Sequence, residues 1–142
     1  MIVSAKLNYS IKAVLELARN AESGRLLNLE TISVNQNIPQ PFLLQLMGIL
    51  KSAGIVESIR GVSGGYLLAK KAAEIKLKDI ILAVEPSLLV NKKEIKNANS
   101  VDAAIEKVWA GARENLEKHL QKITLEMLLE TATTQENFSY SI

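Results

Sequence analysis

The chain has 142 residues, 48% of them hydrophobic, and a formal net charge of only +2 at pH 7. This length suits one domain or a small domain with an arm, and the lack of cysteine excludes a disulfide framework and a thiolate metal site. No uninterrupted apolar run approaches the roughly 20 residues of a membrane helix, and a lysine interrupts the opening MIVSAKLNYS too early for a secretory signal. We therefore expect a cytoplasmic protein.

Charge is unevenly distributed along the chain. Residues 1–80 hold ten Lys/Arg against six Asp/Glu, a net of +4, whereas residues 81–142 hold seven against nine, a net of −2. A basic front half and an acidic back half are typical of a DNA-facing domain followed by an interaction arm. Asymmetries of this size also occur on ordinary solvated surfaces, so the charge pattern alone does not decide the function.

A first helix is predicted over residues 4–22. Ser4 suits the N-cap because its hydroxyl can accept a hydrogen bond from a free backbone amide. The apolar residues recur at helical spacing and would pack inward. They are Leu7, Ile11, Val14, Leu15 and Ala18.

The next stretch has the pattern of a helix-turn-helix. A short amphipathic segment, which Asn28 can cap, leads into a polar turn over 35–37, where Asn37 tolerates a left-handed backbone. The second helix should begin near 39–41, because proline is acceptable in a first turn, and should end at Gly54. In such a motif the second helix can enter a DNA major groove. The apolar side of the first segment is formed by Leu29, Ile32 and Val34.

A glycine-rich turn over 60–65 separates two short β-prone runs, 55–59 and 66–69. They predict an antiparallel hairpin with Arg60 at the start of its tip. A phosphate-binding loop is excluded because that motif needs Gly-Lys-Ser/Thr opening a helix, and here a strand follows. A helix-turn-helix with such a hairpin is a winged helix, so the predicted fold class is mainly α with a small β-wing.

A helix is predicted over 75–85, ended by Pro86, and the polar residues 86–99 then predict a linker. A long helix follows from Ser100 to Lys122, with an apolar seam that alternates by three and four as in a coiled coil. Because no later segment can cover this seam, symmetric dimerisation is the economical explanation. The residues assigned to it are Val101, Ile105, Val108, Trp109, Ala112, Leu116, Leu120 and Ile123.

Trp109 and His119 are each the only residue of their type. Trp109 could line an effector pocket, but a large aromatic beside a helix seam is more often packing. His119 could be a ligand or a pH switch, but no second ligand type clusters with it in the sequence, which favours a structural or exposed role. Thr124 is expected to cap a short helix over 125–130, and residues 131–142 predict a mobile polar tail.

Five segments together resemble the Rrf-two family of bacterial transcription regulators, which includes the IscR, NsrR and CymR repressors. The most specific is the wing pattern Arg60-Gly61-x-x-Gly64-Gly65-Tyr66-x-Leu68. The others are Ser4 to Tyr9, Ile38 to Leu50, Ile75 to Glu85, and Ile123-Thr124-Leu125-x-x-Leu128. The resemblance covers nearly the whole chain and implies a DNA-binding regulator.

The resemblance implies double-stranded DNA as the partner. Gln45 is the best base reader, since glutamine can pair bidentately with adenine. Arg60 on a narrow ribbon can enter an A·T-rich minor groove, where the negative potential is strongest, and the wing glycines would allow close backbone approach to phosphate. The predicted DNA-binding residues are Ser4, Ala5, Lys6, Tyr9, Gln40, Pro41, Phe42, Leu44, Gln45, Lys51, Arg60, Gly61, Ser63, Gly64 and Tyr66.

In cluster-bearing relatives, the segment equivalent to 86–100 carries the cysteines of an iron–sulfur cluster, and a histidine ligand stands roughly where Glu106 is here. One carboxylate without thiolates is not a cluster site. We therefore predict no metal and no cofactor. The regulatory signal would then be a small molecule, a partner protein or the protein's own concentration.

The final residues have a parallel in the cluster-free CymR type of regulator. In that group the partner is the cysteine synthase O-acetylserine thiol-lyase, whose active site accepts a C-terminal isoleucine. Tyr140 and Ile142 are the candidate tail contacts, because backbone amides can capture a carboxylate while the side chain fills an apolar pocket. Many tails end in an apolar residue by chance, so this partnership is kept as an alternative.

These inferences divide the chain into a winged-helix domain over 1–85, a linker over 86–99, dimerisation and closing helices over 100–130, and a tail over 131–142. The predicted function is that of a homodimeric repressor that recognises a palindromic operator through a recognition helix at about 40–53 and a wing at 60–66. An enzyme is disfavoured because the chain has one histidine, no cysteine and no spaced carboxylate pair. A protein-interaction module that has lost DNA binding is the remaining alternative.

Overall fold

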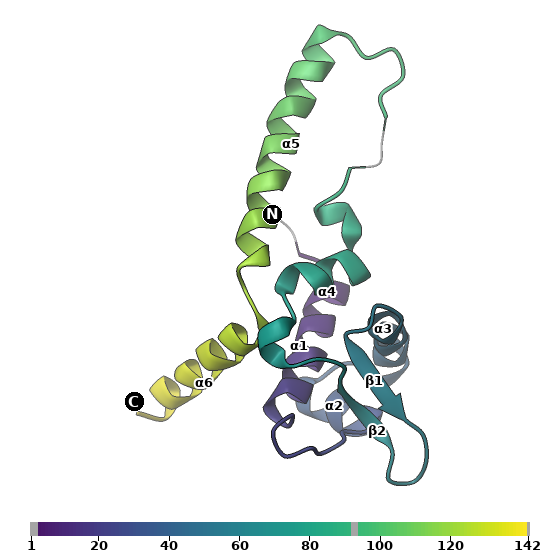
Figure 1. The fold of residues 1–142 in the computed structure, drawn as a ribbon, viewed down its shortest axis with the longest axis vertical. Helices are drawn as coiled ribbons and strands as arrows, with labels where there is room; N and C mark the ends of the chain where they lie inside the picture. The colour runs from purple at the N-terminus through teal and green to yellow at the C-terminus, as the bar shows by residue number, and fades with distance from the viewer. Residues whose placement is uncertain (1–2, 92–93, 142) are drawn as a thin grey trace.

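The computed structural model describes residues 3–91 and 94–141, and within these ranges it is mostly helical with a two-stranded antiparallel sheet (Figure 1). The predicted winged-helix fold class is confirmed. Short 3-10 turns lie at Ala72–Glu74 and Pro86–Leu88. The main elements in chain order are α1 (Ala5–Arg19), α2 (Leu29–Gln36), α3 (Gln40–Ser52), β1 (Val56–Ile59), β2 (Gly65–Leu68), α4 (Leu77–Val84), α5 (Ser100–Gln121) and α6 (Leu125–Ser141).

Helix α1 lies at the centre of the N-terminal half. Ser4 caps it as predicted, because its Oγ accepts a hydrogen bond from the Leu7 amide at 3.2 Å. The same hydroxyl donates to Glu85 Oε2 at 2.9 Å, which ties the start of α1 to the end of α4. The helix ends at Arg19 instead of continuing to residue 22. Its predicted inward residues are all buried or half-buried.

One apolar core is shared by the helices α1, α2, α3 and α4, the base of the hairpin and the start of α6. Each fully buried aliphatic side chain contributes about 1.5–3 kcal/mol relative to an exposed one, so this cluster provides the main driving force for the fold. Its largest fully buried side chains are Leu7, Val14, Ile32, Leu43, Leu46, Met47, Leu50, Val56, Ile75, Ile80, Val84 and Leu125.

Glu16 is a buried charged residue on α1, only 7% exposed. Its Oε1 accepts a hydrogen bond from the side-chain amide of Asn35 at 2.8 Å, and its Oε2 accepts one from the side-chain amide of Gln36. A buried carboxylate is costly unless such partners satisfy it. Because both amides belong to the last turn of α2, Glu16 fixes the helix-turn-helix against α1.

Helices α2 and α3 form the predicted helix-turn-helix. Asn28 caps α2 by accepting a hydrogen bond from the Thr31 amide at 2.8 Å, and Asn37 takes the left-handed conformation with φ 53° and ψ 52°. Gly54 follows the end of α3 with φ +74°, which is the expected use of glycine past a helix end. Val34 is exposed, so its assignment to the inward side of α2 is wrong.

The wing is built on three backbone segments. Strands β1 and β2 pair antiparallel, with Ile59 opposite Gly65. Leu27 forms an isolated bridge with Tyr66, in which the Tyr66 amide donates to the Leu27 carbonyl at 2.7 Å and the Leu27 amide donates back at 3.1 Å. The hairpin is therefore attached to the residues that precede α2.

Two wing glycines are required by close backbone packing inside the molecule. A Cβ on Gly65 would lie 2.6 Å from the Leu27 carbonyl oxygen, and a Cβ on Gly64 would lie 2.1 Å from the Ile59 carbonyl oxygen. Internal packing therefore explains these two glycines without any approach to phosphate. Gly61 has open space around its Cβ position and φ +119°, so its role is to allow the turn.

The C-terminal half differs from the sequence prediction at α6. Thr124 caps this helix as expected, accepting a hydrogen bond from the Met127 amide at 3.2 Å. However, α6 continues to Ser141 instead of ending at Glu130, so residues 131–141 are helical and the predicted mobile tail is corrected there. An ion pair between Arg19 and Glu136 at 2.6 Å holds this extension to α1. Ile142 lies outside the described residues.

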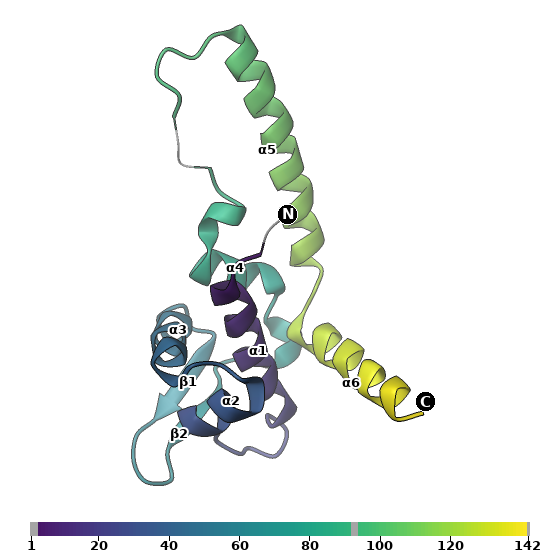
Figure 2. The same ribbon diagram turned by 180° about the vertical axis from the view of Figure 1, so that it is seen from behind.

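Helix α5 forms an arm that stands away from the winged-helix domain (Figures 1 and 2). Its base is attached by an ion pair between Lys78 on α4 and Glu117 at 2.7 Å. The predicted linker over 86–99 begins with the 3-10 turn Pro86–Leu88, and Leu89 next to it is buried in the core. No helix within the described ranges is long and apolar enough to cross a membrane.

Gly65→Ala is expected to lower the free energy of unfolding by about 1–3 kcal/mol, because the new methyl group collides with the Leu27 backbone. Gly48→Ala is the matched control. Its Cβ would meet nothing within 4 Å in the middle of α3, so it should leave stability unchanged or raise it by about 0.5–1 kcal/mol. Urea denaturation followed by circular dichroism at one protein concentration compares them, and equal stability of the two variants would contradict the packing described.

Candidate nucleic-acid interface

The outer face of α3 carries the predicted base-reading side chains. Its inner face is buried in the core through Leu43, Leu46, Met47 and Leu50. The opposite side leaves Gln40, Leu44 and Gln45 exposed, together with Gly48. The Gln45 amide therefore lies on solvent-exposed helix surface, as base readout in a major groove requires.

Two residues at the edge of this exposed face, Phe42 and Ile49, are half-buried. The Phe42 ring packs edge-on against the Tyr9 ring, with centroids 5.7 Å apart and an interplanar angle of 80°. Ile49 also packs against the core. Phe42, which is among the predicted DNA-binding residues, is therefore only partly accessible from solvent. The aromatic pair has a consequence for the site, because it holds the opening of α1 beside the opening of α3.

The α1 opening contributes fewer free polar groups than its sequence indicates. The Ser4 hydroxyl is already used for the cap and for Glu85. Lys6 is half-buried, whereas Ala5 and Lys12 are exposed. The cations nearest this end of the helix are thus Lys6, which is half-buried, and Lys12, which is exposed and lies six positions further along α1.

The wing tip is the most exposed part of the site. Arg60, Gly61, Val62 and Ser63 are all exposed, and Figure 1 shows the hairpin loop projecting beyond the helices. Within the part of the chain that the structure describes, Arg60 makes no hydrogen bond or salt bridge. Gly64, at the end of this loop, and Tyr66, which lies on β2 opposite Ser58, are instead half-buried.

Lys51 links the recognition helix to the wing, a role that the sequence analysis missed. Its Nζ donates a hydrogen bond to Ser58 Oγ on β1 at 2.7 Å. Lys51 itself remains exposed, so its charge still faces solvent beside α3. One side chain thus positions two elements and keeps a cation at their junction.

The cations of the winged-helix domain and those of the α5 arm differ in whether they form salt bridges. Among described residues, salt bridges join Arg19, Lys78, Arg113 and Lys118 to glutamates, and three of these four pairs include a residue of α5. None of Lys6, Lys51 and Arg60 has an acidic partner within those ranges. The positive charge of the winged-helix face is therefore available to a polyanion, whereas much of that on the arm is neutralised locally.

The predicted seam on α5 is divided into two parts. At its lower end, Leu120 is 8% exposed and lies in the domain core, so it is not available to an intermolecular surface, and Leu116 is half-buried against the same core. The upper part is uncovered, with Val101 and Val108 64% exposed, Ile105 52% and Trp109 57%. Ala112 is exposed between the two parts, and Ile123 is half-buried beyond them.

The two predicted contact residues of the C-terminal tail lie at the edge of what the structure describes. Residue 140 lies in the last turns of α6, but its side chain is outside what the structure describes, as is all of Ile142. His119 is exposed on α5, as expected for a residue without a ligand role.

Comparison with known proteins gives a consistent match. The family model Rrf2, described as an iron-dependent transcriptional regulator, matches residues 3–131. An HTH-type transcriptional regulator of Neisseria meningitidis serogroup A is 37% identical over 133 residues, which cover 92% of this chain and 88% of the relative. The regulator IscR of Cronobacter sakazakii is 34% identical over 127 residues, covering 88% of this chain and 78% of the relative.

Solved structures show the same architecture. The structure of CymR, the global cysteine regulator of B. subtilis, superposes with a TM-score of 0.77 at 28% identity, covering 92% of this chain and 98% of that one. T. potens IscR superposes with a TM-score of 0.75 at 31% identity, covering 93% and 88%. The relatives named here are regulators and not enzymes.

The iron in the family description does not fit the side chains of this chain. There is no cysteine to supply thiolate, and no three His, Asp or Glu side chains in the described ranges come together as a metal site. Glu106, near the position of a histidine ligand in some relatives, instead accepts hydrogen bonds from Arg113 and from the Asn91 amide, the latter at 3.3 Å. Its carboxylate therefore anchors the segment before α5.

Proposed function

Because this chain belongs to the Rrf2 family of DNA-binding transcriptional regulators, we propose that it is a cytoplasmic homodimeric repressor of a palindromic operator. The recognition helix α3 would read bases in the major groove, and Arg60 would enter the adjacent minor groove. The observation that carries this proposal is that the last turn of α3 and the tip of the wing each expose a cation, Lys51 and Arg60, that has no acidic partner among the described residues.

Electrostatics support the proposed docking. A DNA duplex attracts free cations because binding releases condensed counterions. Lys6, Lys51 and Arg60 come from α1, α3 and the wing and have no acidic partner among described residues, so each can meet phosphate or the minor groove without breaking an internal pair. Gln45 projects from the same face and supplies base discrimination.

The exposed stripe on α5 supports the homodimer. Val101, Ile105, Val108 and Trp109 lie on one side of the helix, in line with Leu116 and Leu120. The lower part of this stripe is covered by the domain, and the upper part is not. A second copy presents the same stripe, so a two-fold contact covers both at once. Two recognition helices related by two-fold symmetry imply a palindromic operator.

Arg60→Ala and Gln45→Ala test the docking on DNA from upstream of the protein's own gene, by fluorescence anisotropy. Gln45→Ala should cost about 1–3 kcal/mol at one base pair per half-site. Arg60→Ala should weaken binding and reduce the slope of log affinity against log salt by about one per arginine removed.

Lys122→Ala is the control for these variants, because it also removes one exposed cation per protomer but lies at the end of α5. It should bind like the unmodified protein. Wild-type affinity and salt slope in both Arg60→Ala and Gln45→Ala would show that the assigned reading elements are wrong.

Val108→Glu tests the dimer by introducing a carboxylate in the middle of the exposed stripe, where it would be buried without a partner. Analytical ultracentrifugation should show monomers for this variant at concentrations where the unmodified chain is dimeric. Ala110→Glu adds the same charge on the opposite face of α5 and should leave the dimer intact. Dimers of equal stability in both variants would place the interface elsewhere.

A complex with cysteine synthase is the second candidate, favoured by the likeness to the cysteine regulator CymR. Since α6 is helical to Ser141, the last turns would have to unwind before the C-terminus could enter an active site. Calorimetry of cysteine synthase with the full chain and with a chain lacking residues 139–142 separates the cases. Heat of binding that disappears on truncation supports the complex, and equal or absent heats rule it out.

A further inference from the structure

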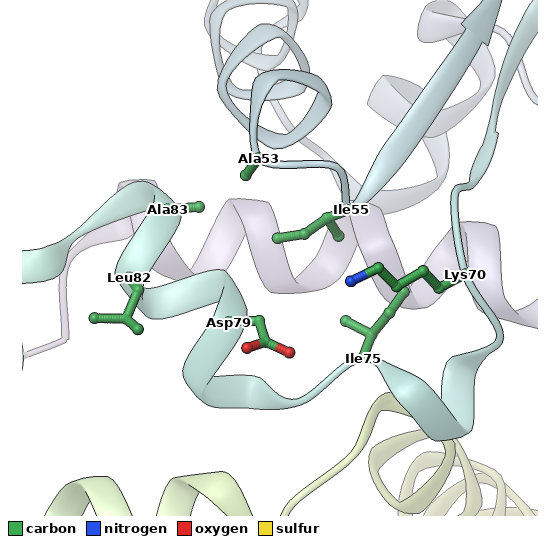
Figure 3. A pocket seen from close by; sticks show the side chains of 7 residues that line it. All are labelled: Ala53, Ile55, Lys70, Ile75, Asp79, Leu82 and Ala83. Atoms are coloured by element: carbon green, nitrogen blue, oxygen red, sulfur yellow. The ribbon is translucent and has the colours of Figure 1, made fainter.

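A cavity of about 320 Å³ lies where the end of α3, the exit of β2 and helix α4 meet (Figure 3). Ile55 and Ile75, both buried, form an apolar floor. Ala53 and Ala83 line two sides of the cavity, and their small side chains do not fill it. This volume is at the lower end of the roughly 300–1,000 Å³ typical of small-molecule sites, and it suits a ligand with few heavy atoms.

Opposite charges face each other across this floor. Figure 3 shows the Lys70 ammonium group directed over the floor and the Asp79 carboxylate standing on α4 beside it. No salt bridge joins them in the described part of the chain. Asp79 Oδ2 accepts a hydrogen bond from the Lys76 amide at 3.0 Å, which orients the carboxylate and leaves Oδ1 without a hydrogen-bond partner among described residues. Lys70 makes no hydrogen bond within the same ranges.

We propose that this cavity binds a small aliphatic α-amino acid. Its carboxylate would pair with Lys70, its ammonium group with Asp79, and its side chain would cover Ile55 and Ile75. An α-amino acid carries adjacent groups of opposite charge and one apolar branch, which are the three features that the cavity presents. Charge-assisted hydrogen bonds to both groups, together with apolar burial, distinguish this class from simple carboxylates and amines.

The position of the cavity gives the ligand a regulatory consequence. Lys70 follows the wing strand β2, Ala53 ends the recognition helix, and Asp79 belongs to α4, which supports the α5 arm. An amino acid that bridges Lys70 and Asp79 therefore connects the DNA-reading elements to the arm. If its affinity differs between free and DNA-bound protein, DNA affinity must change by the same factor. This consequence rests on the proposed DNA-binding function, whereas the site itself does not.

Binding is measured first without DNA, by calorimetry and by methyl NMR of the full-length protein. L-Valine, L-leucine and L-methionine are the probes, and at least one should bind saturably with a dissociation constant on the order of 1 mM or tighter. The NMR shifts should be centred on Ala53, Ile55 and Ala83. For L-leucine, 4-methylvalerate lacks the ammonium group and isoamylamine lacks the carboxylate, and each should bind at least about tenfold more weakly than the amino acid.

Lys70→Met and Asp79→Asn remove one charge each and retain the size of the side chain. In Asp79→Asn, the side-chain amide oxygen can still accept the hydrogen bond from the Lys76 amide, so the helix start is preserved. Each variant should weaken amino-acid binding at least about tenfold. Lys71→Met is the control, because Lys71 is the exposed neighbour of Lys70 and does not line the cavity. It should bind as the unmodified chain does.

No saturable binding of the three amino acids overturns the proposal, as does equal binding of L-leucine and its two truncated analogues, or wild-type affinity in Lys70→Met. Operator affinity is then compared with and without the bound amino acid. Amino-acid binding in a protein that binds no DNA would refute the proposed function and leave the site intact. Unchanged operator affinity at saturating amino acid would refute the regulatory coupling alone.

Discussion

Helix α1 is the element to which the rest of the molecule is attached, and it holds its neighbours through four side chains. Ser4 hydrogen-bonds to the end of α4, Tyr9 packs on the start of α3, Glu16 receives two amides from the end of α2, and Arg19 pairs with Glu136 on α6. Of these, Glu16 imposes the strictest constraint, because a buried carboxylate that lost its amide donors would be left uncompensated. The angle at which α2 and α3 present the reading face is therefore set from inside the domain and not from its surface.

The sequence was informative wherever the cause of a structure lies within a few residues. Ser4, Asn28 and Thr124 cap helices because their side chains reach amides two or three residues away, and Asn37 and Gly54 take left-handed conformations that few other residues adopt. The wing followed from glycines and β-prone runs in the same way. The exposed face of α3 could also be predicted, since helical periodicity separates Gln45 from the buried Leu43 and Leu46.

Features that depend on distant partners were not predictable. The extension of α6 is held to α1 by Arg19, which precedes its partner Glu136 by 117 positions. The burial of Glu16 depends on amides 19 and 20 positions later. Likewise, the apolar stripe on α5 has the same periodicity along its whole length in the sequence. In the structure, α4 and the core cover only its lower part. Periodicity identifies which side of a helix is apolar, and only the tertiary arrangement decides which turns of it remain uncovered.

The contact between Lys51 and Ser58 bears on how such regulators diversify. Lys51 is at the end of α3 and Ser58 is on the first wing strand, so the hydrogen bond couples the two elements that we propose to read different grooves. Transplanting α3 alone into a related scaffold would carry the lysine without its hydroxyl acceptor, and the grafted helix and the resident wing would then be joined only through their backbone connection. Under the proposed docking, specificity would therefore be transferred by the continuous segment from α3 through β1, not by the helix alone.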